Sequence, residues 1–280
     1  MADSVIGTVL ERHSDVVLVT GGCSGLGREI VRDLKRCKHP KVVVFDLHIP
    51  PDEERFPEVH YYSCDVSDVN SIQALAAIVK REVGIVTVVI NNAGITSGKT
   101  LLELSFGEIE KIIAVNLTSN FYINKTFLPD MVLLQRGYIV TVSSVLGYMT
   151  PARLSAYGAA KSGVIALHES LTYELSRTMG SSTGIKTLLV APGQMRTTLF
   201  NGVNTPSSIF APELEPSYVA QKIVRALKCG RRGELQLPLY GHFLPLFRAT
   251  PWPITLFVRR MSGMDEAMDS HSTVGPSSRA

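Results

Sequence analysis

The stretch Val16–Gly27, Val-Val-Leu-Val-Thr-Gly-Gly-Cys-Ser-Gly-Leu-Gly, decides the fold. Its first five residues form an apolar run, which is typical of a parallel strand buried on both faces. Glycines follow, and from about Gly25 apolar residues recur at helical spacing as far as Leu34. A second apolar run, Lys41–Asp46, completes a strand–glycine turn–helix–strand unit.

The glycine turn is a candidate phosphate site. Small residues let the backbone approach a pyrophosphate, and the N-terminus of the next helix offers free N–H groups and a positive dipole. A glycine cluster alone is usually only a turn, but a strand before it and a helix after it favour the phosphate site. The candidate contacts are Gly21, Ser24, Gly25, Leu26 and Gly27.

Asp46 ends the second strand, about 20 residues after the glycines, where an acid can bind the adenosine ribose hydroxyls. A carboxylate there repels a 2′-phosphate, so we expect NAD(H) to be preferred. The basic neighbour His48 would soften that preference, and NADP(H) is the alternative cofactor. The simpler interpretation is that Asp46 only caps a strand.

Strands and helices alternate along the rest of the chain. This pattern predicts a single α/β domain, a Rossmann-type doubly wound sheet of about seven parallel strands flanked by helices. Further strands are predicted at Val59–Ser63, Ile85–Ile90, Gly137–Ser144, Ile185–Val190 and Glu234–Pro238, and further helices at Asp68–Glu82, Leu101–Leu134, Leu154–Met179 and Ser217–Lys228. Ligands of such sheets bind at the carboxyl ends of the strands, where the polar motifs of this chain fall.

Tyr157 and Lys161 are spaced i, i+4, which places them on one face of the predicted helix. A phenol titrates near ~10 in water, and a nearby ammonium lowers its pKa. The pair is therefore a candidate acid/base couple. Most such pairs are ordinary surface or boundary residues, so the remaining motifs decide.

Over roughly Val16–Thr198 these residues resemble the short-chain dehydrogenase/reductase family. The TGxxxGxG turn, the NNAG signature and the YxxxK pair are all present, and we find no departure from the family pattern. The matching segments and residues are Thr20–Gly27, Asp65, Val66, Asn91–Gly94, Asn116, Ser144, Tyr157–Lys161 and Pro192–Thr197.

The resemblance implies hydride transfer between a nicotinamide cofactor and an alcohol or carbonyl carbon. Tyr157 would be the general acid/base, Ser144 would orient the substrate oxygen, and Lys161 would hold the nicotinamide ribose and lower the pKa of Tyr157. Asn116 would support a water-linked proton relay. Further cofactor contacts are implied for Asp65, Val66, Asn92, Ala93, Gly94, Tyr157, Lys161, Pro192 and Thr197. Taken singly, Ser144 and Asn116 could be ordinary structural residues.

Residues 194–216 occupy the place of the family's substrate lid. Their apolar side chains predict a lipophilic substrate, as do Leu146, Tyr148, Met149 and Leu154 near the catalytic helix. The alternative is that these side chains are core or a subunit contact. Residues 1–238 are thus expected to form the dehydrogenase domain, lid included.

Residues 239–260 are rich in aromatics, prolines and arginines. The prolines disfavour a spanning helix, so we expect an element that lies at a membrane interface. A dimer contact or a flap over the substrate pocket is the alternative. Residues 261–280 are polar and are predicted to be a disordered tail.

The composition excludes several classes of protein. A net charge of +3 does not indicate nucleic-acid binding, and 45% hydrophobic with 19% charged residues indicates a packed globular chain. The four scattered cysteines fit a reducing compartment and predict no metal site. We expect neither a signal peptide nor a transmembrane helix at the N-terminus, hence a cytoplasmic protein, peripheral on endoplasmic reticulum membrane or lipid droplet.

The closer likeness is to the retinol dehydrogenase and 17β-hydroxysteroid dehydrogenase branch, which acts at membranes and lipid droplets. It implies an NAD(H)-dependent enzyme for a lipophilic alcohol, ketone or aldehyde such as a retinoid, a steroid or a long-chain alcohol. A homodimer is the default assembly. The alternatives are an NADPH-dependent carbonyl reductase and a non-catalytic dinucleotide-binding scaffold of lipid droplets.

Overall fold

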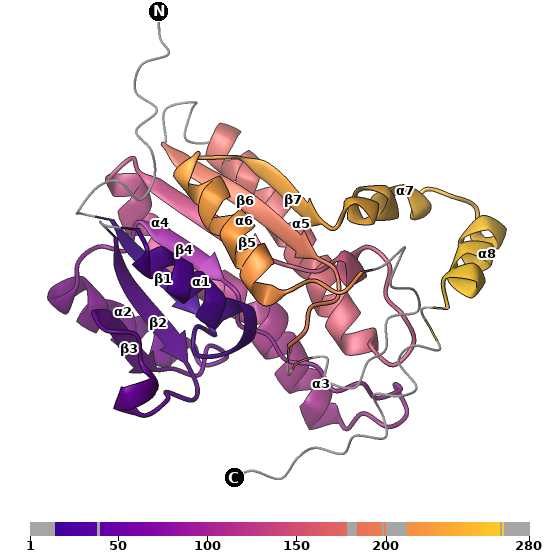
Figure 1. The fold of residues 1–280 in the computed structure, drawn as a ribbon, viewed down its shortest axis with the longest axis horizontal. Helices are drawn as coiled ribbons and strands as arrows, with labels where there is room; N and C mark the ends of the chain where they lie inside the picture. Colours follow the sequence, from indigo (N-terminus) through magenta and orange to yellow (C-terminus); the bar gives the residue numbers. More distant parts are fainter. Residues whose placement is uncertain are drawn as a thin grey trace, which may run out of the picture.

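Seven parallel strands form one sheet in the order β3-β2-β1-β4-β5-β6-β7 (Figure 1). The computed structural model describes residues 15–37, 40–177, 184–197, 199, 212–263 and 265. The predicted doubly wound sheet of seven strands is therefore confirmed. The strands are β1 Val16–Thr20, β2 Lys41–Asp46, β3 Val59–Ser63, β4 Val88–Asn91, β5 Gly137–Val142, β6 Ile185–Pro192 and β7 Gly233–Leu237.

Helices cover both faces of this sheet (Figure 1). Helices α1 and α6 pack on one face and α2, α4 and α5 on the other. The α-helices are α1 Gly25–Lys35, α2 Val69–Glu82, α3 Phe106–Ile113, α4 Ser119–Leu133, α5 Ser155–Arg177, α6 Pro216–Lys228, α7 Leu244–Phe247 and α8 Trp252–Ser262. Short helical turns lie at η1 Asp52–Glu54, η2 Ala114–Thr118, η3 Val145–Gly147 and η5 Leu239–Phe243.

The alternation of side chains along each strand divides the core into two layers. In β1, Val17 and Val19 pack toward α1 and α6, whereas Val16 and Leu18 pack toward the opposite helices. All five residues of β1 are buried, as expected for a central parallel strand. The apolar runs in the sequence therefore indicated the inner strands correctly.

The prediction that Leu101–Leu134 is mostly helical is confirmed from Phe106 to Leu133, but its start is wrong. Helix α3 begins at Phe106, where Ser105 and Glu108 form a capping box that stops the helix from extending backwards. A π-helical turn, η2, then separates α3 from α4. The apolar residues of Leu101–Leu104 suggested helix, but the cap fixes the boundary.

Other boundaries differ by a few residues. Strand β4 begins at Val88 rather than Ile85, and β6 continues to Pro192 because its last residues pair with β7. Strand β5 ends at Val142 instead of Ser144, which leaves Ser144 as the N-cap of η3. The predictions for residues 1–14, for most of the lid and for most of the tail fall outside the described residues.

After β7, the chain forms η5, α7 and α8. Figure 1 shows α7 and α8 beside the β7 edge, with α8 projecting away from the sheet. Among the described residues, we find no helix that combines the length and the apolar character needed to cross a bilayer.

Phe45 offers a test of the packing. It is fully buried, with its ring centroid 6.1 Å from that of Tyr62 and 6.3 Å from that of Phe127. Phe45→Ala should lower the free energy of unfolding by about 3–5 kcal/mol, because it leaves a cavity. Chemical denaturation measures this, with Leu133→Ala as the control, since Leu133 is 82% exposed. Equal effects of the two variants would contradict the packing.

Candidate active site

A cleft of about 980 Å³ opens at the carboxyl ends of the strands. It lies where the strand order reverses, since β1 is flanked by β2 on one side and β4 on the other. Such switch points are the usual ligand sites of doubly wound sheets. The cleft is lined by the glycine turn, the end of β2, residues 92–99 and the side chains of Ser144, Tyr157 and Lys161.

The glycine turn can accept a phosphate. A Cβ atom at Gly27 would lie 1.9 Å from the carbonyl oxygen of Gly21, so no side chain fits there. Helix α1 begins at Gly25 with no side-chain cap from Ser24 and no acid in its first turn. Its first N–H groups and its dipole are thus available to an anion.

Thr197 supplies a second sign of a ligand on the same wall. Its hydroxyl oxygen is buried, and the described residues offer it no hydrogen-bond partner. A Cβ atom at Gly25 would lie 3.5 Å from the Thr197 methyl carbon, so this hydroxyl sits beside the glycine turn. Buried hydroxyls are rarely left unpaired. The residues present therefore fit a dinucleotide.

The far end of the cleft is acidic. The Asp46 carboxylate accepts hydrogen bonds from the backbone N–H of Cys23 at 2.9 Å and of His48 at 3.2 Å. Hydrogen bonds from the Ser67 side chain and backbone lower the pKa of Asp65, which also lines the cleft next to the buried Val66. Both predicted acids thus lie in the cleft.

In the sequence, Thr20 is notable only as part of the TGxxxGxG turn, and the structure shows what its hydroxyl binds. Its hydroxyl accepts the backbone N–H groups of Asn92 at 3.0 Å and Ala93 at 3.1 Å. The Asn92 amide in turn donates to the carbonyl oxygens of Thr20 and Gly21. The Asn92 side chain therefore holds the glycine turn against the end of β4, and Asn92 also lines the cleft.

Ser144, Tyr157 and Lys161 come together deep in the cleft. The Ser144 hydroxyl is hydrogen-bonded to the Tyr157 phenol. The Lys161 ammonium lies 5.7 Å from the centre of the Tyr157 ring and donates to the Val142 carbonyl at 2.9 Å. All three side chains are at least 95% buried. The structure thus brings the predicted acid/base set into one buried group.

The pKa of Tyr157 differs from the sequence expectation. Burial raises it to about 12, and the hydrogen bond from Ser144 lowers it only in part. Burial also lowers the pKa of Lys161 to about 8. Desolvation disfavours both charged forms and outweighs their attraction here. At neutral pH the phenol is protonated and can donate to a substrate oxygen.

Asn116 lies in the π-helical turn and is fully buried. Its amide donates to the carbonyls of Ile95 at 2.8 Å and Ile112 at 2.9 Å, and its oxygen accepts the Ile95 N–H at 3.2 Å. The side chain therefore ties the helix to the strand end at Ala93–Ile95. The predicted proton relay stays a prediction.

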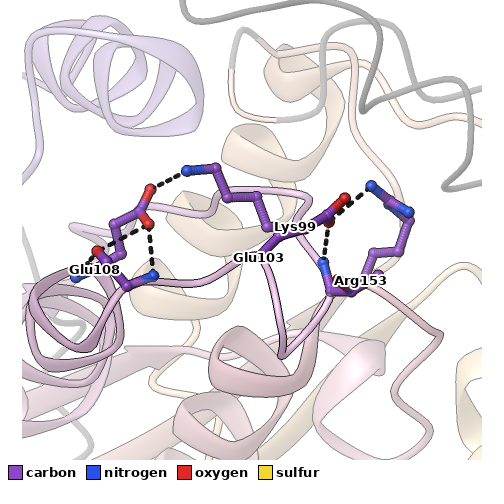
Figure 2. Close-up of polar contacts among 6 residues, drawn as sticks. Lys99, Glu103, Glu108 and Arg153 are labelled. Carbon is purple, nitrogen blue, oxygen red and sulfur yellow. Dashed lines mark hydrogen bonds and ion pairs between the residues drawn. The ribbon is translucent and has the colours of Figure 1, made fainter.

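Two ion pairs line the rim of the cleft (Figure 2). Lys99 pairs with Glu108, whose pKa falls to about 2 because of hydrogen bonds from Lys99 and from Ser105. Arg153 donates to Glu103 at 3.0 Å and to the Gly98 carbonyl at 3.1 Å. Figure 2 shows the two pairs side by side, with Lys99 reaching toward Glu108 and Arg153 toward Glu103. Sequence reasoning missed these residues, because single charged residues outside a motif give no signal in the sequence.

The four residues predicted near the substrate lie outside the cleft lining among the described residues. Leu154 packs with Tyr157 and Ile112 in a buried cluster, against which Leu146 also lies. Met149 is buried, and the Tyr148 hydroxyl donates to Glu234. None of these four is among the residues that line the cleft in the described part of the chain. Met149 and Leu154 are buried, whereas Leu146 and Tyr148 are half-buried, so their predicted contribution to the substrate site stays a prediction.

Comparisons with known proteins agree with this geometry. A family model described as short chain dehydrogenase matches residues 15–207. The uncharacterized oxidoreductase YDL114W of Saccharomyces cerevisiae is 37% identical over 262 residues, which span 92% of this chain and 84% of that protein. Retinol dehydrogenase 10-B of Xenopus laevis is 35% identical over 245 residues, 76% of this chain and 71% of that one.

A solved structure extends the likeness to the fold. The crystal structure of a short-chain dehydrogenase from Streptomyces avermitilis superposes with a TM-score of 0.70 at 25% sequence identity. The match covers 88% of this chain and 97% of that chain. The cleft described above lies in the part of the chain that these relatives share.

Thr20 can be tested without any ligand. Thr20→Val should lower the free energy of unfolding by about 1–3 kcal/mol, because two partly buried N–H groups lose their acceptor. Thr20→Ser keeps the hydroxyl and should recover most of the loss. Urea denaturation compares the two variants, and equal stability of Thr20→Val and the unchanged chain would refute the role given to this hydroxyl.

Proposed function

Because the chain belongs to the short chain dehydrogenase family, a family of NAD(P)-dependent oxidoreductases that act on CH–OH groups, we propose that it interconverts a lipophilic alcohol and its aldehyde or ketone. The observation that carries the proposal is the buried group of Ser144, Tyr157 and Lys161 beside the glycine turn. NAD(H) is the proposed dinucleotide.

The proposed mechanism assigns the substrate oxygen to Ser144 and Tyr157. In reduction the protonated phenol donates its proton to that oxygen, and in oxidation the same oxygen of Tyr157 takes the proton back. The bound nicotinamide supplies or accepts the hydride. Lys161 lies one helical turn from Tyr157, where its ammonium would hold the ribose hydroxyls of the dinucleotide and would stabilise charge that develops on the phenol oxygen.

Burial of the three side chains serves the same chemistry. Solvent that is excluded from Tyr157 and Lys161 cannot screen the interaction between the two groups. The hydrogen bond from Ser144 and that from Lys161 to Val142 fix both side chains before substrate arrives. The protein therefore contributes orientation and a low-dielectric setting.

The preference for NAD(H) rests on Asp46. Its carboxylate lines the cleft at the end of β2, where a 2′-phosphate would meet a like charge. The cation Arg28, on α1, makes other contacts: it donates to the Glu54 carbonyl at 3.2 Å and stacks over the Phe56 ring. His48 is the basic residue that follows Asp46 in the cleft wall.

Two observations support a lipophilic substrate: the names of several relatives and the apolar residues in part of the cleft wall. Proteins named retinol dehydrogenase 10 are among the relatives. Ile95, Val115, Met195 and Leu199 contribute apolar surface to the cleft, and the two ion pairs make its rim polar. This pattern suits a substrate with an apolar body. Turnover measured on a panel of alcohols would identify the particular substrate.

The same proposal includes a homodimer. Phe121 on α4 and Tyr173 on α5 are 49% and 68% exposed, and both helices cover the same face of the sheet. Large exposed aromatics on packed helices favour association. A non-catalytic scaffold is disfavoured, because a protein that only binds dinucleotide has no need of the buried Tyr157 and Lys161.

Tyr157→Phe tests the mechanism. It should lower turnover of alcohols by about 10²–10⁴-fold, because the proton donor is lost, while dinucleotide binding stays unchanged. Steady-state rates and a fluorescence titration measure the two properties. Tyr148→Phe is the matched control, since its hydroxyl bonds to Glu234 outside the cleft. Normal turnover by Tyr157→Phe would remove Tyr157 from the mechanism.

Asp46→Asn tests the cofactor preference. The change keeps the shape and an acceptor oxygen but removes the charge, so the ratio of NADPH to NADH affinity should rise about tenfold. Asp52→Asn on η1 is the control, because its carboxylate is 87% exposed and pairs with Arg55 away from the cleft lining. An unchanged ratio in Asp46→Asn would show that Asp46 does not select the cofactor.

A further inference from the structure

We propose that the C-terminal segment, residues 239–263, docks onto the surface of an anionic lipid membrane and holds the substrate side of the cleft next to it. The docking follows from the surface of the segment. Its use, the direct delivery of an apolar substrate, rests on the proposed function. The two parts are tested separately below.

The segment leaves an unusual amount of apolar surface in water. None of the eleven residues of α8 is buried. Seven large apolar side chains of the segment are exposed: Leu239 76%, Phe243 55%, Leu246 63%, Trp252 71%, Ile254 48%, Phe257 63% and Met261 73%. So many large apolar side chains exposed within one short segment indicate an interaction site.

The charge of the segment selects the partner. Between Leu235 and Met264 the sequence contains no Asp or Glu, but it contains Arg248, Arg259 and Arg260. Arg260 is exposed and has no ion pair within the described residues. Apolar side chains combined with unbalanced arginines fit the boundary between acyl chains and anionic headgroups.

The shape of the segment agrees with a position in the interface plane. Helix α8 has eleven residues, about half the length that a spanning helix needs. It starts after Pro251 with Trp252, a residue type that favours the headgroup level. A second copy of the chain is a poorer partner, because a symmetric contact would bring together two copies of a segment that has no acid between Leu235 and Met264.

Two arginines connect the segment to the catalytic region. Arg248 donates to the carbonyls of Tyr148 at 2.9 Å and Gly147 at 3.1 Å, and to the Ser162 hydroxyl at 3.1 Å. Gly147 and Tyr148 lie between Ser144 and Tyr157 in the chain, and Ser162 follows Lys161. The segment is therefore fixed to the part of the chain that carries all three catalytic side chains.

A second connection is made by Arg259, near the C-terminal end of α8. Arg259 donates to the Thr150 carbonyl at 2.9 Å and pairs with Asp265, which accepts the N–H of Ala152 at 2.8 Å. Arg248 before α8 and Arg259 within it thus tie the segment to residues 147–153, so docking of α8 would place this stretch next to the membrane. Arg153, at the end of this stretch, lines the cleft.

The chain contains one tryptophan, so Trp252 is a built-in probe of docking. The full chain, without dinucleotide or substrate, is titrated with vesicles of phosphatidylcholine and with vesicles that also contain phosphatidylserine. We expect the Trp252 emission to shift to shorter wavelength, and brominated acyl chains to quench it. The affinity should be higher for the anionic vesicles and should fall with added salt.

A variant pair makes the test specific. Phe257→Ser with Met261→Ser should lower the vesicle partition coefficient about tenfold or more, because two apolar side chains are lost. Leu133→Ser is the matched control, since Leu133 is equally exposed on α4. No Trp252 response to anionic vesicles, or an equal loss in the control, would overturn the proposal. So would a lipid-free emission shift that grows with protein concentration, which indicates self-association.

Turnover measurements separate docking from the reaction. With docking intact, vesicles should raise the rate on a bilayer-dissolved long-chain alcohol in the unchanged chain, but much less in the double variant. If the unchanged chain docks but oxidises no alcohol, the proposed function fails and docking stands. If alcohols are oxidised but vesicles do not change the Trp252 emission, docking fails and the proposed function stands.

Discussion

The hydrogen bonds between Thr20 and the start of the Asn92–Ala93 segment hold the carboxyl ends of β1 and β4 together. These neighbouring strands lie 70 residues apart in the chain, and their ends form the floor of the cleft. The Asn92 amide closes the same contact from the other side by binding the carbonyls of the glycine turn. The dinucleotide site therefore depends on this small group of hydrogen bonds, while the apolar layers on both faces of the sheet support the strands around it.

Most of the sheet could be predicted from the sequence, because buried parallel strands leave continuous apolar runs such as Val16–Thr20. The start of α3 could not be predicted from apolar residues. The boundary is set by the reciprocal bonds of Ser105 and Glu108, and the leucines at 101, 102 and 104 are not helical. The motif Ser-x-x-Glu was present in the sequence and would have indicated the cap.

The site was predictable in its residues and less so in its physics. The i, i+4 spacing placed Tyr157 and Lys161 together, but spacing contains no information about solvent. Burial then moved both pKa values toward the neutral forms. Contacts that depend on tertiary packing were also out of reach. The Asn92 side chain is turned to the glycine loop, and Leu154 lies in the core.

Arg153 has a left-handed backbone, with φ of 65°, two residues before α5. For a residue with a long side chain this costs about 1–3 kcal/mol, and the bonds to Gly98 and Glu103 keep it in place. Release of the loop at Gly98 would let Arg153 relax and the first turn of α5 fray. Opening of the loop and fraying near Tyr157 thus form one cooperative unit, and amide hydrogen exchange in these two segments would share a single opening free energy.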